Sequence, residues 1–578
     1  MKLLLHVLLA AAWLHACASA SDSTRIGAAE QFMKGGRYFA ACKEYETLVH
    51  ELQSANGDSG EALLRASEGH VEALLADEQF ARAVKSALST VELAGRMLEG
   101  DQKALAESWT RLAVLLGRAR RIDLAGKLLD QVVAISEGTK NKSTSMDEVT
   151  ASAELQIGIF FTNLERFDEA MTHFRKSLTL AERATGNESM LVQRICQQLA
   201  RAVEGYCLKT GSSARMQEGE ELCQRALQCA IKLAAGRSGE RVALALAELA
   251  ISCQRNGSSD KAIDLATEAL EIGIAAQSER PDALGTLMDV YTQLMKALGK
   301  QVQASEKISH WVSATKETAE ASSGKIGNLL HAAGKGYATL GYAAEAENAY
   351  WEAMKAREAE LGKDHPETAR SLMNVAILVQ ARGDLANPES MIKRCIEIDE
   401  NQPGGWSNEA MLTRIRLFGL HIKQGRINDA LAVQETMLRM ERERYGHARQ
   451  TGVASLVMLA EHHLAKNDLK PALKAWQEAL STAMESPEDH HALGLIVTVP
   501  ILQAAHRQNA VLEMEPTLRR CLVKLAPLAS DDRAIAGSIM EWKRLYSEAL
   551  AAIDIDVAVV ADRLAKMISG TDPGDLRP

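Results

Sequence analysis

The amino-acid sequence predicts an all-α protein built as a solenoid, in which antiparallel helix pairs are stacked one after another. The first observation is a repeat: the helix-breaking residues Gly341 and Gly383 are 42 residues apart, and the same interval leads on to Gly425. The second is composition, because aromatic residues make up only 4% of the chain and there are only 11 prolines. A fixed period in this range is typical of solenoids, so the 578 residues predict one long array.

Inter-helix turns set the order of the elements along the chain. The repeat places them at Gly36, Glu78, Arg120, Glu165, Gly211, Gly257, Gly299, Gly341, Gly383, Gly425, Asn467, Asn509 and Ala551, which predicts about thirteen helical hairpins. The interval exceeds 42 residues only between Arg120 and Gly257. Two polar segments there, residues 138–145 and 209–214, show no helical stripe, and we interpret them as tolerated loop insertions in preference to binding elements.

Small residues recur at fixed distances from the turns, where two helices must approach closely. Five residues after the turn stand Ala41, Ala83, Ala125, Ala170, Ala262, Ala304, Ala346, Ala430 and Ala472. Seven before it stand Ala29, Ala113, Gly158, Ala250, Gly334, Ala376 and Ala460, and nine after it stand the aromatic residues Tyr45, Phe174, Tyr350 and Trp476. Pro388 replaces the alanine after Gly383, so we expect that helix to begin late, at Pro388, after an extended link.

The amino terminus has the pattern of an export signal. Lys2 precedes an apolar run at residues 3–14, and small residues follow as far as Ala20. Two processings are expected alternatives: cleavage after Ala20, or lipid attachment at Cys17 in a segment similar to a bacterial lipobox. We therefore expect an exported protein, either secreted, periplasmic or associated with the envelope. No later segment is apolar enough to span a membrane, since the best, residues 492–505, is short and contains Pro500.

Charge and motifs argue against several functional classes. The formal net charge of −10 removes the attraction to phosphate that dominates non-specific nucleic-acid binding, so no nucleic-acid partner is expected. His462 and His463 are neighbours that lie on different helix faces, whereas metal-binding helices space their ligands one turn apart. No catalytic, metal-binding or cofactor-binding constellation is recognised, and we expect neither an enzyme nor a cofactor.

Eight cysteines follow Cys17 along the chain. Cys253 occupies a position where other repeats carry small or apolar residues, so we interpret these cysteines as small hydrophobic side chains. A disulfide among Cys207, Cys223 and Cys229 stays open as the less favoured alternative, because spacing alone does not establish the geometry of a bridge.

The most regular stretch, residues 278–486, resembles a known repeat family. The order of small residue, aromatic, turn, alanine, aromatic and alanine appears in Gly334, Tyr337, Gly341, Ala346, Tyr350 and Ala353, and it resembles the tetratricopeptide repeat. The 42-residue period and the linker Leu361–Ala369, running into Ser371–Ala376, further resemble the kinesin-light-chain subgroup. The resemblance implies a right-handed superhelix of helix pairs, with a concave groove that holds other proteins.

The same resemblance implies that the first helix of each hairpin lines this groove. Polar residues on one face of three successive first helices are the candidates for peptide binding: Asn328, His331, Lys335, Arg370, Asn374 and Arg416. Asn374 matches an asparagine of the kinesin-light-chain pattern whose equivalents hydrogen-bond extended peptides. A solvated polar face is the alternative, and we weigh the two equally. Leu412 and Met373 stand where a clamp for chaperone carboxyl tails would need polar groups.

These observations predict a non-enzymatic, exported scaffold that binds an extended segment or a helix of another protein. The alternative is an envelope-assembly or structural lipoprotein tethered through Cys17. The expected division is a leader at residues 1–20, an array with irregular insertions at 25–277, a regular array at 278–486, degenerate capping hairpins at 487–568 and a disordered tail at 569–578.

Overall fold

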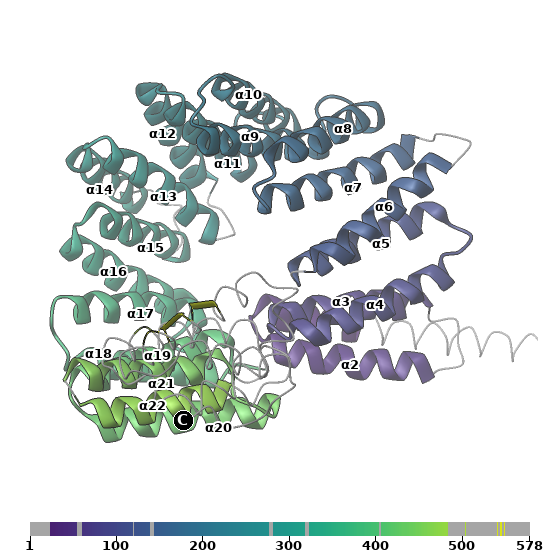
Figure 1. Ribbon diagram of the computed structural model, residues 1–578. Helices are drawn as coiled ribbons and strands as arrows, with labels where there is room; N and C mark the ends of the chain where they lie inside the picture. Colours follow the sequence, from purple (N-terminus) through teal and green to yellow (C-terminus); the bar gives the residue numbers. More distant parts are fainter. Residues whose placement is uncertain are drawn as a thin grey trace, which may run out of the picture. The chain divides into compact units, whose positions relative to one another are not determined.

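The computed structural model describes residues 24–483 apart from short gaps at 55–59, 120, 139–143, 277–280, 318–322, 404–405 and 467, together with isolated positions beyond residue 500. Every regular element in these residues is an α-helix, which confirms the predicted fold class. Residues 24–34 form a helix, and the 21 helices α2–α22 follow it in chain order (Figure 1). The predicted leader, Cys17, the last two turns and the tail lie outside the described residues.

Two compact units divide the helices between them, the first ending after α17 and the second beginning with α18. The named helices of the first unit are α2 (Tyr38–Ser54), α3 (Gly60–Ala76), α4 (Phe80–Met97), α5 (Gln102–Arg118), α6 (Ile122–Gly138), α7 (Thr144–Asn163), α8 (Phe167–Thr185), α9 (Met190–Thr210), α10 (Met216–Leu233), α11 (Glu240–Arg255), α12 (Ser259–Ala275), α13 (Pro281–Ala297), α14 (Gln301–Glu317), α15 (Ser323–Leu340), α16 (Ala343–Leu361) and α17 (Pro366–Ala381). Those of the second are α18 (Pro388–Glu400), α19 (Asn408–Lys423), α20 (Ile427–Tyr445), α21 (Gln450–Ala465) and α22 (Leu469–Ala483). The boundary expected at residue 278 stays a prediction.

The predicted inter-helix turns adopt the left-handed backbone conformation. Gly341 has φ +94°, which glycine adopts at little cost, and the N–H of Tyr342 donates to the carbonyl of Tyr337 over 2.9 Å. This bond closes the end of α15 and points the chain back along α16. The predicted turn residues with positive φ are Gly36, Glu78, Glu165, Gly211, Gly257, Gly299, Gly341, Gly383 and Gly425. Their positions are confirmed, while Arg120 and Asn467 lie outside the described residues.

The small residues of the repeat lie where the helices touch. All nine alanines that follow the turns by five residues are completely buried, with 0% exposure. Gly334 lies against the ring of Tyr350, and a Cβ added there would be only 2.8 Å from Tyr350 Cδ1. Gly158 and Phe174 repeat the arrangement. The predicted packing positions are therefore confirmed, because these contacts leave no room for a larger side chain.

Two expectations about the irregular hairpins have different outcomes. Helix α18 begins at Pro388, as predicted from the missing alanine. The two predicted loop insertions are shorter than expected, because α7 already begins at Thr144 and α9 continues to Thr210. The exposed end of a helix can be polar throughout and show no apolar stripe. The prediction took the missing stripe as loop, and it therefore assigned the start of α7 and the end of α9 to the loops.

The seven described cysteines are buried and have free thiols. Burial raises the pKa of Cys196 and of Cys223 to about 12, so neither is a reactive thiolate at neutral pH. Their interpretation as small hydrophobic residues is confirmed.

Candidate functional site

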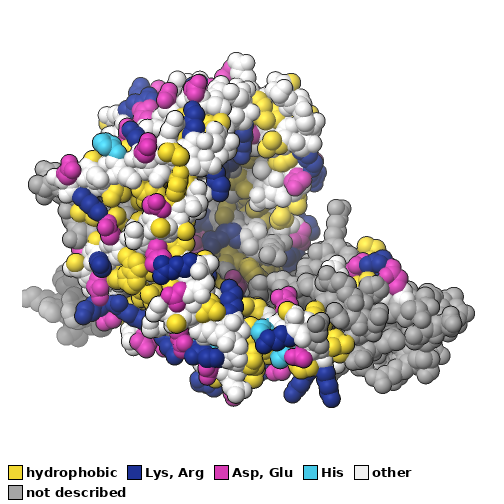
Figure 2. Space-filling view, turned by 90° about the vertical axis from the view of Figure 1, so that its left-hand side faces the viewer, with side chains coloured by type: hydrophobic (Ala, Val, Ile, Leu, Met, Phe, Trp, Pro, Cys, Tyr) yellow, Lys and Arg dark blue, Asp and Glu magenta, His cyan; other side chains and the backbone are white. Residues whose placement is uncertain are grey.

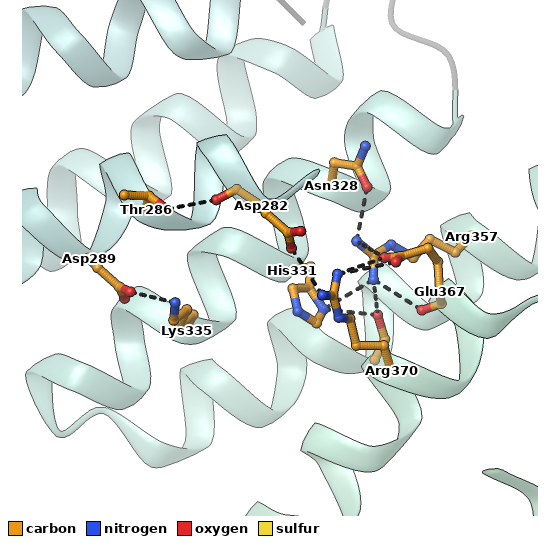
Figure 3. Close-up of polar contacts among 10 residues, drawn as sticks. Asp282, Thr286, Asp289, Asn328, His331, Lys335, Arg357, Glu367 and Arg370 are labelled. Carbon is orange, nitrogen blue, oxygen red and sulfur yellow. Dashed lines mark hydrogen bonds and ion pairs between the residues drawn. The ribbon is translucent and has the colours of Figure 1, made fainter. Parts of the chain in front are cut away.

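Helices α13, α15 and α17 share the side toward which the first unit curves. Packed helices lie about 8–10 Å apart, so α13 and α17, with α15 between them, would be about 16–20 Å apart in a flat array. Arg370 of α17 nevertheless contacts Asp282 of α13, with 3.0 Å between Nη2 and Oδ1. A contact across an intervening helix requires curvature toward this side. We call it the inner face, and it carries Asp282, Asp289, Asn328, His331, Lys335 and Arg370 (Figure 3). Asn374 follows Arg370 by four residues on α17, so helical spacing puts it on the same face.

Beneath this face lies Arg357 of α16, a residue that no sequence pattern indicated as functional. It is completely buried, and it passes Gly327, where an added Cβ would lie 2.9 Å from Arg357 Cγ. Nη1 donates to the Glu367 carbonyl and to Ser371 Oγ, each over 3.0 Å. Nη2 lies 3.0 Å from Oε2 of the Glu367 carboxylate. Arg357 thereby ties α16 to the first turns of α17.

Two predicted binding residues of α15 turn toward Arg357 (Figure 3). Asn328 Oδ1 accepts from Nη2 over 2.9 Å. His331 Nδ1 lies 3.2 Å from Nη1 and 3.1 Å from Ser371 Oγ. The pKa of His331 is lowered from 6.5 to about 3, mainly by burial and secondarily by the positive charge of Arg357. The ring is therefore neutral at neutral pH. Both residues are already hydrogen-bonded inside the protein, and their binding role stays a prediction.

Lys335 and Arg370 are paired with carboxylates on the inner face. Lys335 pairs with Asp289, and Arg370 pairs with Asp282 and with Glu367. The side chains of Lys335 and Arg370 remain 48% and 46% exposed. Ion pairs this exposed contribute only about 0–1 kcal/mol, so the carboxylate of a guest could replace Asp282 or Asp289 at small cost.

Asn374 and Arg416 differ from the other four candidates. Asn374 is half-buried on α17, one helical turn from Arg370, and within the described part of the chain its amide has no hydrogen-bond partner. Arg416 is exposed on α19 of the second unit and has no charged partner among the described residues. The structure therefore brings five of the six candidates together in the first unit, and Arg416 does not belong to that group.

Residues 150–189 and 328–367 match the sequence profile of the tetratricopeptide repeat, and the second match contains Asn328, His331, Lys335 and Arg357. The hairpins α7–α8 and α15–α16, which these two segments cover, are tetratricopeptide repeats. Protein KINESIN LIGHT CHAIN-RELATED 3 from Arabidopsis thaliana is 25% identical over 262 residues, 45% of this chain and 39% of the relative. Protein KINESIN LIGHT CHAIN-RELATED 2 from the same plant is 25% identical over 281 residues, 48% of this chain and 41% of the relative.

The repeats are thus close to those of kinesin light chains, although the chain spans less than half the length of these curated relatives. Among solved structures, BtubC (BKLC) from P. vanneervenii is similar with a TM-score of 0.34 at 17% identity, over 45% of this chain and 94% of that one.

The surface of this tetratricopeptide-repeat protein shows no dominant charge on the side seen in Figure 2. Lys and Arg side chains alternate there with Asp and Glu, and hydrophobic side chains lie between them. Within the described residues, no group of three or more His, Cys, Asp or Glu side chains is arranged to hold a metal ion. None of the described helices combines the length and the apolar character that crossing a membrane requires.

Proposed function

We propose that this tetratricopeptide-repeat protein is a non-enzymatic scaffold that holds an extended segment or a helix of another protein on the inner face. The observation that carries the proposal is the free amide of Asn374 beside Arg370, on the concave side of the first unit. An amide both donates and accepts, so it can hold the main chain of a guest without selecting its sequence. Shallow contacts spread over adjacent repeats would add to the affinity.

A change at Asn374 tests the proposal against a matched control. With a tagged full-length protein as bait, we expect Asn374→Ala to lower recovery of the bound partner about fivefold, the effect of losing a hydrogen bond worth about 1 kcal/mol. Asn348→Ala changes an exposed asparagine of α16, outside the inner face, and should leave recovery unchanged. Both variants should melt within about 1 °C of the unchanged protein, since surface substitutions cost little.

Quantitative mass spectrometry of the captured proteins gives the answer. A protein that is retained by the unchanged chain and by Asn348→Ala, but lost with Asn374→Ala, identifies the partner of the inner face. Equal recovery with both variants would remove the inner face from the proposed function.

We also propose that the protein is exported, on the basis of Lys2 and the apolar and small residues that follow it as far as Ala20. The alternative is a structural or envelope-assembly lipoprotein held through Cys17. Mass spectrometry of the mature amino terminus separates the two. A chain that begins at Ser21 supports the free scaffold, a diacylated Cys17 supports the tethered one, and an intact leader in the native protein would contradict export.

A further inference from the structure

We propose that Arg357 is a positioning residue that sets the hydrogen-bonding polarity of the inner face, so that Asn328 and His331 offer a guest only N–H donors. The consequence of this polarity for binding rests on the proposed function: a guest would present carbonyl or carboxylate oxygens to Asn328 and His331. Its test does not, because the polarity can be measured in the protein without a guest.

The polarity follows from the chemistry of the guanidinium group, which has only N–H donors and no acceptor. His331 Nδ1 lies 3.2 Å from Nη1, and Asn328 Oδ1 lies 2.9 Å from Nη2. An atom facing these donors must be an acceptor. His331 Nδ1 therefore carries no hydrogen, which places the hydrogen of the neutral ring on Nε2. Asn328 uses its oxygen on Arg357, which leaves its NH₂ group for a guest.

Ser371 completes the assignment of the hydrogens. Its Oγ lies 3.0 Å from Arg357 Nη1 and 3.1 Å from His331 Nδ1. Because Nη1 can only donate, the hydroxyl accepts from it and turns its own hydrogen toward Nδ1. The two hydrogens of Nη1 are then directed to the Glu367 carbonyl and to Ser371 Oγ. His331 Nδ1 faces the cationic nitrogen, which cannot accept a hydrogen bond, and accepts from the Ser371 hydroxyl instead. The hydrogens of Nη1, of Nη2 and of the Ser371 hydroxyl then each find an acceptor, while the buried Arg357 Nε has no partner among the described residues. In this arrangement His331 Nδ1 is the acceptor for the Ser371 hydroxyl and is unprotonated.

The outward atoms of both side chains are open to a guest. Asn328 and His331 are half-buried, and among the described residues neither Asn328 Nδ2 nor His331 Nε2 has a hydrogen-bond partner. Neither atom is among the described polar atoms that are both buried and unpartnered, so both remain accessible. Lys335 and Arg370 are also donors without acceptor capacity. Four side chains on α15 and α17 thus favour acceptors. Among the described residues, Asp282 and Asp289 of α13 and Glu367 of α17 compete for the two cations.

The groups that face His331 also disfavour a protonated, positively charged ring. Arg357, Arg370 and Lys335 each oppose a positive charge on the ring, and Tyr350 of α16 contacts its plane edge-on, with 5.2 Å between the ring centroids. The Glu367 carboxylate, which would favour an imidazolium, is already engaged by Arg357 and Arg370. Desolvation adds to this, and the ring stays neutral.

The test is the tautomer of His331 in the full-length protein. Proton–nitrogen correlation spectra of deuterated protein carrying ¹⁵N-histidine report it, and loss of the signal in His331→Gln assigns it. We expect the Nε2–H tautomer at neutral pH and a ring that does not titrate near its ordinary pKa of 6.5. A hydrogen on Nδ1, or a ring that titrates near 6.5, would overturn the proposal whatever happens to partner binding.

Variants separate positioning by Arg357 from a merely structural role. In Arg357→Met we expect the two tautomers of His331 to mix and its pKa to rise toward 6.5, whereas Arg370→Met, which removes a cation without a contact to Nδ1, should leave the tautomer unchanged. Should Arg357→Met fail to fold, Ser371→Ala decides: the facing guanidinium should keep the Nε2–H form without the hydroxyl. A switch to Nδ1–H in Ser371→Ala, or a tautomer unmoved in a folded Arg357→Met, contradicts the proposal.

Discussion

Arg357 and Glu441 occupy the same position of the repeat, 84 residues apart, and carry opposite charges. Both are buried, with 0% and 1% exposure, and both reach from a second helix to the beginning of the next first helix. Arg357 donates to the Glu367 carbonyl over 3.0 Å. Glu441 accepts from the backbone N–H groups of Arg449 over 2.7 Å and of Gly452 over 3.3 Å. A buried charged side chain at this repeat position therefore connects a second helix to the start of the next first helix, whether its charge is positive or negative.

The difference shows what decides the sign. A helix begins with unpaired N–H groups and favours an anion there. Helix α17 already has a side-chain cap, since His365 Nδ1 accepts from the N–H of Glu367 over 3.1 Å, and the Glu367 carboxylate balances Arg357. Helix α21 starts after Arg449, whose side chain caps nothing, and Glu441 takes over the capping. The repeat thus specifies a buried polar link, and the groups that the next helix leaves unpaired specify its charge.

Removing the anionic link should have the largest effect. We expect Glu441→Ala to destabilise the α20–α21 junction by about 3 kcal/mol, because the N–H groups of Arg449 and Gly452 lose a buried acceptor and a cavity remains. Repeat arrays can unfold in parts, so amide hydrogen exchange in α21 is the suitable measurement. Glu443→Ala, at a 63% exposed carboxylate on the same helix, should change exchange by less than about 0.5 kcal/mol. Equal effects of the two changes would show that Glu441 caps nothing.

The two junctions also differ in what the sequence could predict. The helices and turns around both follow from one signal, the 42-residue recurrence of small residues, because close helix contacts tolerate few side chains. The charged position was visible as Arg357, Asp399 and Glu441, each sixteen residues after a turn, but charged residues on helices are mostly solvated, so the pattern predicted no burial.

The candidate site was predicted only in part, for a related reason. Lys335 and Arg370 lie on the inner face, as helical spacing indicates, because spacing fixes a side-chain direction; that they and Asn374 bind a peptide stays a prediction. Spacing does not fix hydrogen-bond partners: the contact between Asn328 and Arg357 depends on how α16 packs under α15, and the ion pair of Arg370 with Asp282 depends on the curvature of the array. Both are tertiary facts that no single helix pattern contains.

A change at a position that the two junctions share should affect them equally. Ala346 of α16 and Ala430 of α20 both follow their turns by five residues and are completely buried. We expect Ala346→Leu and Ala430→Leu each to cost about 2 kcal/mol by overpacking the helix contact, measured as the loss of amide protection in the changed hairpin. Ala344→Leu, at an exposed position of α16, is the control and should be nearly neutral. A neutral Ala346→Leu would mean that this position does not set the packing.

The smallest effect expected is also the most discriminating, because the two junctions should respond to pH in opposite directions. The pKa of His331 is lowered from 6.5 to about 3 in the folded protein, so on acidification the ring is protonated in the unfolded chain first. The contribution of the neutral ring to the free energy of unfolding is therefore present above pH 6.5 and is lost as the pH falls toward 3. Burial raises the pKa of Glu441 above its ordinary 4.5, despite the hydrogen bonds from Thr451, Arg449 and Gly452. The contribution of the protonated Glu441 carboxyl to the free energy of unfolding is therefore full below pH 4.5, and it is lost as the pH rises through the raised pKa.

Amide hydrogen exchange at about pH 7 and about pH 5, corrected for the intrinsic rates, compares the two junctions in one molecule. On acidification we expect the amides of α15 and α17 to lose protection and those of α20 and α21 to gain it. His331→Gln should remove the first change and Glu441→Gln the second, each without effect on the other junction. A loss of protection in both would show that hydrogen bonding to the carboxylate outweighs burial at Glu441. The anionic link would then be stabilised by its charge, and the two signs would no longer be equivalent solutions at this repeat position.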